Sequence, residues 1–263
     1  MNWLSSLPAG VLVLAWLGLA LLVAALGRLG VRALVPAEEQ AQVPLVASPL
    51  MPALGAAFAI FAALTLASEA GYLRSSEDLV SQEAAAASRL AWAATSPGVD
   101  ADPIQAALQD YLESTRSNEW VGGDAASGDD PATASALASL EREVRAEAAR
   151  PEIGTPASTE LLASMDAVSS TRRARIAAAE REIRALYVVT LVVSGLALIL
   201  NAGAVTTRSS RRTALLAAGL ASVVGLSLAL LFSITAPWSG PLGVSGHPLD
   251  TVIRDLSAGF FAA

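Results

Sequence analysis

Hydrophobic residues are concentrated in four uncharged segments of the chain, which polar stretches separate. The segments cover roughly residues 7–26, 50–67, 186–207 and 214–234. A helix needs about 20 residues to cross the roughly 30 Å hydrocarbon core of a bilayer, and each segment is close to that length. The pattern predicts an all-α integral membrane protein with four transmembrane helices in two hairpins.

Most of the charge lies in the 117-residue insert between the two predicted hairpins. It holds 20 acidic residues against 11 arginines, a net charge of −9 in a chain whose total is −7. An acidic surface repels polyphosphate, so no nucleic-acid binding is expected. The predicted parts are a first hairpin (1–68), the insert (69–185), a second hairpin (186–238) and a C-terminal tail (239–263).

Three residue pairs in the insert indicate where helices start. Each puts a helix-capping side chain before a proline, which fits the first turn because no N–H is needed there. The pairs are Asp102-Pro103, Asp130-Pro131 and Thr155-Pro156. The glycine-rich stretch 121–130 predicts a flexible linker between two of these helices.

The second and third spans are expected to continue into the insert as long helices. No helix breaker separates Pro156 from Val205, and the second span is expected to run past Glu69 to about Ala94. The prolines at the start of this span fit the entry of its helix; they are Pro44, Pro49 and Pro52. The insert is therefore predicted to be a helical extramembrane bundle formed by extensions of spans 2 and 3.

Charged residues fall on the apolar faces of these two extensions. Glu83 lies among Leu79, Ala86 and Leu90 at helical spacing, while Arg172 and Arg175 fall in or beside the apolar stripe of the later helix. Because a buried charge is costly unless paired, we expect Glu83 to pair with Arg172 or Arg175. The favoured interpretation is an ion pair that sets the register of the helices.

Two polar residues in the spans are candidate pore or contact residues. Glu69, at the end of the second span, is interpreted as a solvated interfacial acid, with an ion pathway as the alternative. Asn201 is expected to make an interhelical hydrogen bond or, alternatively, a pore contact. Small residues at four-residue spacing in the fourth span, Ala217, Ala221 and Gly225, favour a close helix contact.

Nothing in the chain has the pattern of an enzyme active site. There is no cysteine, and the single histidine, His247, lies in a tail that we interpret as non-helical, without acidic partners arranged around it. No phosphate-binding loop or nucleophile motif is present in the sequence. We therefore expect no catalysis, no cofactor and no metal site.

Several of these residues resemble a family of bacterial membrane proteins with a bestrophin-like domain. The shared features are a glutamate in an alanine-rich helix, an acid-tryptophan pair, an R-x-x-R pair and a proline-aromatic-Ser-Gly signature. Here they are Glu83, then Glu119-Trp120, then Arg172 and Arg175, and finally Pro237, Trp238, Ser239 and Gly240. The resemblance implies an oligomeric anion channel with a cytoplasmic helical region.

Two functions remain open on the sequence. One is a membrane protein that binds a protein partner at its acidic insert or is associated with the cell envelope; the alternative is a bestrophin-like anion channel that forms a homo-oligomer in the lipid bilayer. The arginine-only, alanine-rich composition is typical of a GC-rich bacterial genome, so the plasma membrane is expected. Eight arginines flank the spans on the insert side against five on the other, which favours a cytoplasmic insert.

Overall fold

A computed structural model describes residues 9–119, 129–179, 185–207, 211–234, 238 and 243–261, and its regular structure there is entirely helical. The chain divides into two compact units. Unit 1 comprises Met1–Gly71, Glu182–Ala236 and Gly240–Leu242, and unit 2 comprises Tyr72–Arg181, Pro237–Ser239 and Gly243–Ala263.

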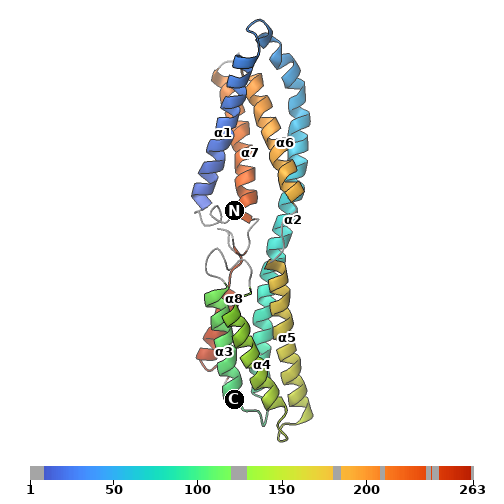
Figure 1. Ribbon diagram of the computed structural model, residues 1–263, viewed down its shortest axis with the longest axis vertical. Helices are drawn as coiled ribbons and strands as arrows, with labels where there is room; N and C mark the ends of the chain where they lie inside the picture. The colour runs from blue at the N-terminus through green and yellow to red at the C-terminus, as the bar shows by residue number, and fades with distance from the viewer. Residues whose placement is uncertain are drawn as a thin grey trace. The chain divides into compact units, whose positions relative to one another are not determined.

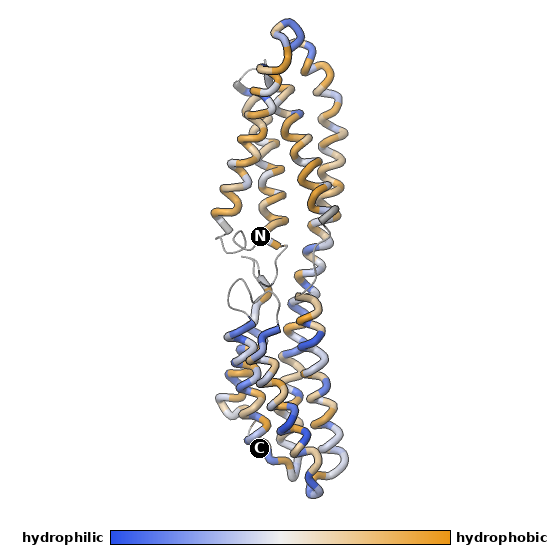
Figure 2. Tube along the Cα trace, in the orientation of Figure 1, coloured by the Kyte–Doolittle hydropathy of each residue, from blue (hydrophilic) through white to orange (hydrophobic). Residues whose placement is uncertain are grey.

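Unit 1 is built from four long apolar helices. These are α1 (Ala9–Leu34), the first part of α2 (Val43–Ala94), α6 (Ala185–Val205) and α7 (Arg211–Ile234) (Figure 1). Each is long and apolar enough to cross a membrane, which confirms the four predicted spans. Figure 2 shows apolar residues along these segments and more hydrophilic residues in the helices of unit 2.

Close helix contacts in unit 1 depend on glycine. A Cβ atom on Gly203 of α6 would lie 2.4 Å from the Ala24 carbonyl oxygen of α1, and one on Gly225 of α7 would lie 2.9 Å from the Trp16 carbonyl oxygen. Helix backbones approach this closely only where side chains are small. The small-residue contact predicted for the fourth span thus forms, against α1. Since α1 contacts both α6 and α7, the arrangement in two hairpins stays a prediction.

Side-chain hydrogen bonds join the helices of unit 1 at one end. The Asn201 amide of α6 donates to the Ala47 carbonyl of α2 at 2.9 Å, which confirms the predicted interhelical bond. The Arg32 guanidinium donates a hydrogen bond to the Thr207 carbonyl at 3.1 Å, just after the last turn of α6. A positive charge at this end of a helix interacts favourably with the helix dipole.

The prolines of α2 do not all lie at its entry. The helix begins at Val43, directly after a 3-10 turn at Glu39–Ala41, so Pro49 and Pro52 lie inside it and the expectation for these two was wrong. A proline inside a helix removes one backbone hydrogen bond. Both prolines are on the exposed side of α2, and the hydrogen bond from Asn201 reaches the backbone beside them.

Unit 2 is a helical bundle around a continuous apolar core. It contains the rest of α2 together with α3 (Ala101–Asn118), α4 (Pro131–Ala148), α5 (Thr155–Ala179) and α8 (His247–Ser257). The core contains fully buried side chains from several helices, among them Leu90, Leu108, Leu140, Leu161 and Leu249. The predicted extension of α2 to Ala94 is confirmed, whereas residues 180–184 lie outside the described residues, so the continuity of the helix over 156–205 stays a prediction.

The helix starts of unit 2 follow their capping residues, with two corrections. Asp130 accepts the Thr133 N–H at 3.0 Å and starts α4, as predicted. However, α3 begins at Ala101 after Asp100, a short distance before the predicted start. The segment from His247 is helical rather than non-helical, because Pro248 fits its first turn and Leu249, Val252 and Leu256 form an apolar face.

Candidate functional site

One face of α2 is buried at spacings of three and four residues over much of its length. Such spacing keeps one side of a helix against its neighbours. The buried positions from the membrane segment onward are Phe58, Ala62, Thr65, Glu69, Tyr72, Ser76, Val80 and Glu83. Polar residues occupy five of these eight positions, and two of them are acids. This face therefore carries both candidate sites, one in each unit.

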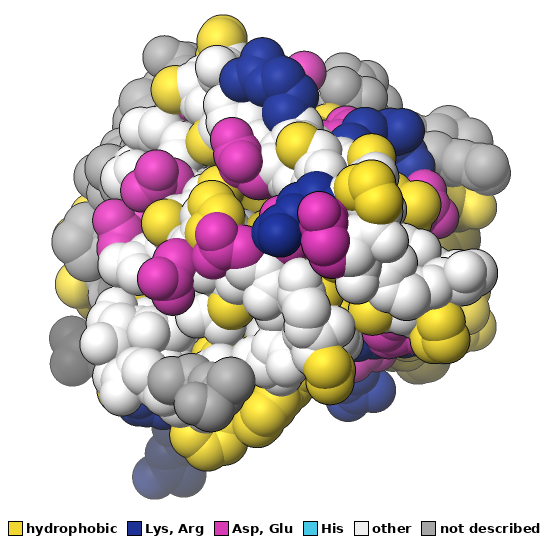
Figure 3. Space-filling model, turned by 90° about the horizontal axis from the view of Figure 1, so that it is seen from below, with side chains coloured by type: hydrophobic (Ala, Val, Ile, Leu, Met, Phe, Trp, Pro, Cys, Tyr) yellow, Lys and Arg dark blue, Asp and Glu magenta, His cyan; other side chains and the backbone are white. Residues whose placement is uncertain are grey.

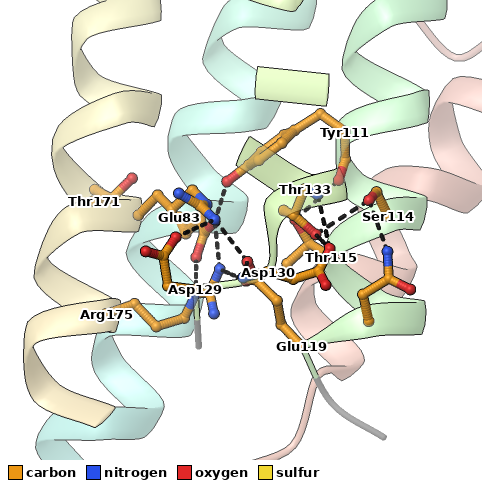
Figure 4. A network of polar contacts seen from close by, with 12 residues as sticks. Glu83, Tyr111, Ser114, Thr115, Glu119, Asp129, Asp130, Thr133, Thr171 and Arg175 are labelled. Atoms are coloured by element: carbon orange, nitrogen blue, oxygen red, sulfur yellow. Dashed lines mark hydrogen bonds and ion pairs between the residues drawn. The ribbon is translucent and has the colours of Figure 1, made fainter. Parts of the chain in front are cut away.

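The site in unit 2 is a cluster of two acids and two arginines that we call the charge cluster: Glu83, Glu119, Arg172 and Arg175 (Figure 4). Arg175 Nε lies 2.5 Å from Glu83 Oε2, and its Nη2 lies 2.5 Å from Glu119 Oε2. Arg172 Nη2 lies 2.7 Å from Glu119 Oε1. The predicted partner of Glu83 is thus Arg175, and Glu119 bridges the two arginines.

Three helical elements supply these side chains. Glu83 comes from α2, Arg172 and Arg175 from one face of α5, and Glu119 directly follows the last residue of α3. All four residues are buried, and Arg175 is only 1 % exposed. Because the two acids balance the two arginines, the charge cluster is internally neutral, and removing one member would leave an uncompensated buried charge.

Tyr111 of α3 makes a hydrogen bond to the charge cluster. Its hydroxyl donates to Glu83 Oε1, and the side chain is fully buried. Burial raises the pKa of Tyr111 well above its ordinary value, and the neighbouring Glu83 carboxylate raises it further. Burial alone would lower the pKa of Arg175, but the carboxylates, Glu83 foremost, raise it above its ordinary value. The tyrosine and the arginine therefore keep their protons.

The charge cluster also anchors the segment that leads into α4. Arg172 Nη2 lies 3.5 Å from Asp129 Oδ1, and the Asp130 N–H donates to Glu119 Oε1 at 3.5 Å. Residues 121–128 of the predicted linker lie outside the described residues. The cluster therefore fixes the register of three helices and the return of the chain to the bundle, which is a structural arrangement.

The site in unit 1 is a cavity of about 470 Å³ beside the membrane segment of α2, which we call the α2–α6 cavity. Its described lining combines aromatic and aliphatic side chains with one carboxylate and four hydroxyl groups. The lining residues are Phe61, Leu64, Thr65, Ser68 and Glu69 of α2 and Tyr187 and Thr190 of α6. Glu69 is 4 % exposed. The expectation of a solvated interfacial acid was wrong, because Glu69 shares the buried face of α2 with Thr65 and Tyr72.

Sequence reasoning did not bring Glu119 or Tyr111 to the charge cluster. Glu119 was singled out only through the family resemblance, and Tyr111 was not among the candidate residues. Both belong to the buried face that runs along α3 and past its end. Leu108, Leu112 and Thr115 lie on the same face at helical spacing. That spacing was the signal that an acid closing α3 would be buried and would need a partner.

The remaining signature residues are only partly described. Trp238 packs against the apolar core of unit 2, whereas Trp120, Pro237, Ser239 and Gly240 lie outside the described residues. Within the described ranges no group of three or more His, Asp or Glu side chains could hold a metal ion. His247 is exposed at the start of α8.

Four membrane-spanning helices and a helical bundle with a neutral buried charge cluster define a multi-pass membrane protein. The particular family follows from a match of the Bestrophin-like domain over residues 18–249, so the chain belongs to the bestrophin-like domain family. No curated protein and no solved structure matched the chain.

Proposed function

We propose that the protein is one subunit of an oligomeric assembly that conducts ions, with the α2–α6 cavity on the ion path. The observation that carries the proposal is Glu69, an acid buried in a helix that is otherwise apolar enough to cross a membrane. Acids inside membrane segments are costly and usually mark ion or substrate pathways. The hydroxyl groups of Thr65, Ser68 and Thr190 line the same cavity.

In this proposal several copies of the chain assemble around the ion path, and the helices of each copy form part of its wall. The outward faces of α1, α2, α6 and α7 carry many exposed large apolar side chains, including Leu14, Leu64, Val193 and Leu216. Such faces lie against lipid or against other apolar helices. A conducting path between subunits also agrees with the oligomeric build that the family's name suggests.

The charge on the path favours cations over the anions that the family's name suggests. Among the described residues lining the cavity, Glu69 is the one carboxylate, and there is no arginine. The insert, which follows the second span in the chain, carries a net charge of −9, and negative charge repels anions. We therefore assign a cation preference to the path.

Reconstitution of the purified full-length protein in liposomes tests this function. We expect potassium flux that exceeds chloride flux, and a large loss of potassium flux in Glu69→Gln. Glu77→Gln removes an exposed acid from the same helix and should conduct like the wild type. Vesicles that pass neither ion, or a protein that stays monomeric in the bilayer, would refute the proposal.

A second candidate function is binding of a protein partner by unit 2. The observation that favours it is an exposed aromatic pair: Trp92 is 51 % and Phe260 61 % exposed, with ring centroids 5.7 Å apart. On the face seen in Figure 3, acidic side chains lie beside arginines and apolar side chains. A photo-crosslinking residue at position 92 should capture one partner in cells, and capture of lipid or of nothing would exclude this candidate.

We also propose that the protein lies in a bacterial plasma membrane with unit 2 in the cytoplasm, and that it has no enzymatic activity. The lack of native cysteine makes the orientation simple to test. Glu143→Cys puts a single thiol at an exposed position of unit 2. A membrane-impermeant maleimide should label it only after cells are opened, and labelling of intact cells would reverse the orientation.

A further inference from the structure

We infer that one end of unit 1 is a binding surface for anionic phospholipids, whose phosphate groups are held by arginines. This surface, which we call the arginine end, is formed by residues 28–47, 201–207 and 211–217, where α1 and α6 end and α2 and α7 begin. The inference is independent of the proposed conduction, because it concerns an outer surface of the helices and not a path for ions.

The packing of unit 1 brings arginines from separate parts of the chain to this end. A Cβ on Gly203 of α6 would lie 3.0 Å from the Arg28 backbone nitrogen, and the Arg32 guanidinium reaches the Thr207 carbonyl just past the last turn of α6. Helix α7 begins four residues after Thr207, so its first residue lies within about 14 Å of it. Three helices therefore place Arg28, Arg32 and Arg212 at the same end of the unit.

The charge of the arginine end is positive and is not neutralised by the described part of the chain. Residues 28–42 and 206–213 contain five arginines and two acids, a net charge of +3. Arg28, Arg32 and Arg212 form no ion pair with any described carboxylate. The surface therefore attracts an anion from outside the described chain.

Arg28 is the arginine that most needs such an anion. It is partly buried, and its Nε is enclosed without a hydrogen-bond partner among the described residues, whereas its two terminal nitrogens remain accessible. A buried charge is costly unless it is paired. Arg32 lies one turn further along α1, and like charges at this spacing repel each other. Its bond to the Thr207 carbonyl uses one of five N–H donors, so both arginines can hold one phosphate group.

The apolar surroundings of these arginines favour a lipid over free phosphate. Leu29, Leu34 and Leu215 are all exposed beside them. Directly after Arg212 begins an almost entirely apolar crevice of about 170 Å³, whose lining includes Ala202, Val205, Leu216, Ala217 and Leu220. Arginines next to exposed apolar helix faces lie at the level of lipid headgroups. An anionic phospholipid supplies both the phosphate group and the acyl chains that this surface accommodates.

Native mass spectrometry of the full-length protein with phosphatidylglycerol and phosphatidylcholine measures the preference. The two lipids, used with the same acyl chains, both carry a phosphate group, but only phosphatidylglycerol has a net negative charge. One arginine near a headgroup contributes about fivefold to the binding of an anionic lipid, so three predict a preference on the order of a hundredfold. Sodium phosphate should not displace phosphatidylglycerol, and displacement would show that the surface holds free phosphate instead.

Variants and a matched control assign the preference to the arginine end. Arg28→Gln/Arg32→Gln should lower it about 25-fold, while Arg142→Gln/Arg173→Gln, which removes two exposed arginines from unit 2, should keep it. If the first double variant does not fold, Arg212→Gln changes an exposed side chain and should lower the preference about fivefold. Equal binding of the two lipids to the wild type, or an unchanged preference in these arginine-end variants, would overturn the inference.

Discussion

The substitution Glu83→Gln should destabilise unit 2 severely while leaving unit 1 intact. It keeps the size of the side chain but removes one negative charge from a cluster in which two acids balance two arginines. Among the described acids, Arg175, which is 1 % exposed, would keep only Glu119 as an ion-pair partner and would share it with Arg172. Breaking a buried ion pair in this way costs about 3–5 kcal/mol.

Hydrogen exchange measured by mass spectrometry on the full chain in detergent reports the loss unit by unit. A cost of about 3–5 kcal/mol corresponds to an increase in exchange rate of roughly two to four powers of ten where the amides open with the bundle. Peptides from α3 and α5 should show this increase, and peptides from α1 and α7 should not. The double variant Glu83→Gln/Arg175→Met restores charge balance and should be more stable than the sum of its single variants implies.

The exposed pair between Arg89 and Glu160 supplies the matched control. It joins the same two helices, α2 and α5, at 2.9 Å, with side chains about half exposed. Exposed pairs contribute little to stability, so Glu160→Gln should leave exchange nearly unchanged. Two outcomes would contradict a stabilising role of the buried charge cluster in unit 2. One is that Glu83→Gln raises exchange no more than Glu160→Gln does. The other is that the double variant loses as much stability as its two single variants together.

Three further substitutions test other parts of the structure. Gly203→Ala would put a Cβ 2.4 Å from the Ala24 carbonyl oxygen and should lower the stability of unit 1 by about 1–3 kcal/mol in thermal unfolding, whereas Gly219→Ala, with open space around it, should not. Asn201→Leu removes the hydrogen bond to α2 and should cost about 0.6–1.7 kcal/mol in the same assay, and no loss would show the bond to be dispensable. The raised pKa of Tyr111 means that its contribution to stability is complete below its ordinary value of 10.0 and is lost as pH rises towards the folded value. When the pH is raised from neutral to above about 10, the free energy of unfolding should therefore fall less in Tyr111→Phe than in the wild type. If the two proteins lost stability in parallel over this pH range, the assignment would be contradicted.

Local patterns in the chain were sufficient to predict much of the secondary structure. The four spans followed from hydrophobic runs of the right length, because a bilayer imposes that length on a helix. The extension of α2 to Ala94 followed from the absence of any breaker, and the start of α4 from Asp130 and its proline. Where the local rule was weaker, it failed: Pro49 and Pro52 lie inside α2, and α8 forms in a segment interpreted as non-helical.

The candidate sites were only partly predictable. Helical spacing placed Glu83, Arg172 and Arg175 on or beside apolar faces and so predicted that Glu83 pairs with one of the two arginines. In the structure the partner is Arg175, whose Nε lies 2.5 Å from Glu83 Oε2. The same spacing along α3 was not extended to Glu119, so its position between the two arginines was not predicted.

The sequence by itself determined most of the helical segments, the four that are long and apolar enough to cross a membrane, and the need of Glu83 for a charged partner, since these depend on residues close together along the chain. Only the tertiary structure decided that Arg175 rather than Arg172 pairs with Glu83, although both arginines share one helix face. It also decided that Glu69 is buried beside a cavity instead of being solvated at a span end. Both outcomes depend on how α2 packs against helices more than 90 residues away in the chain, and neighbouring residues carry no information on that packing.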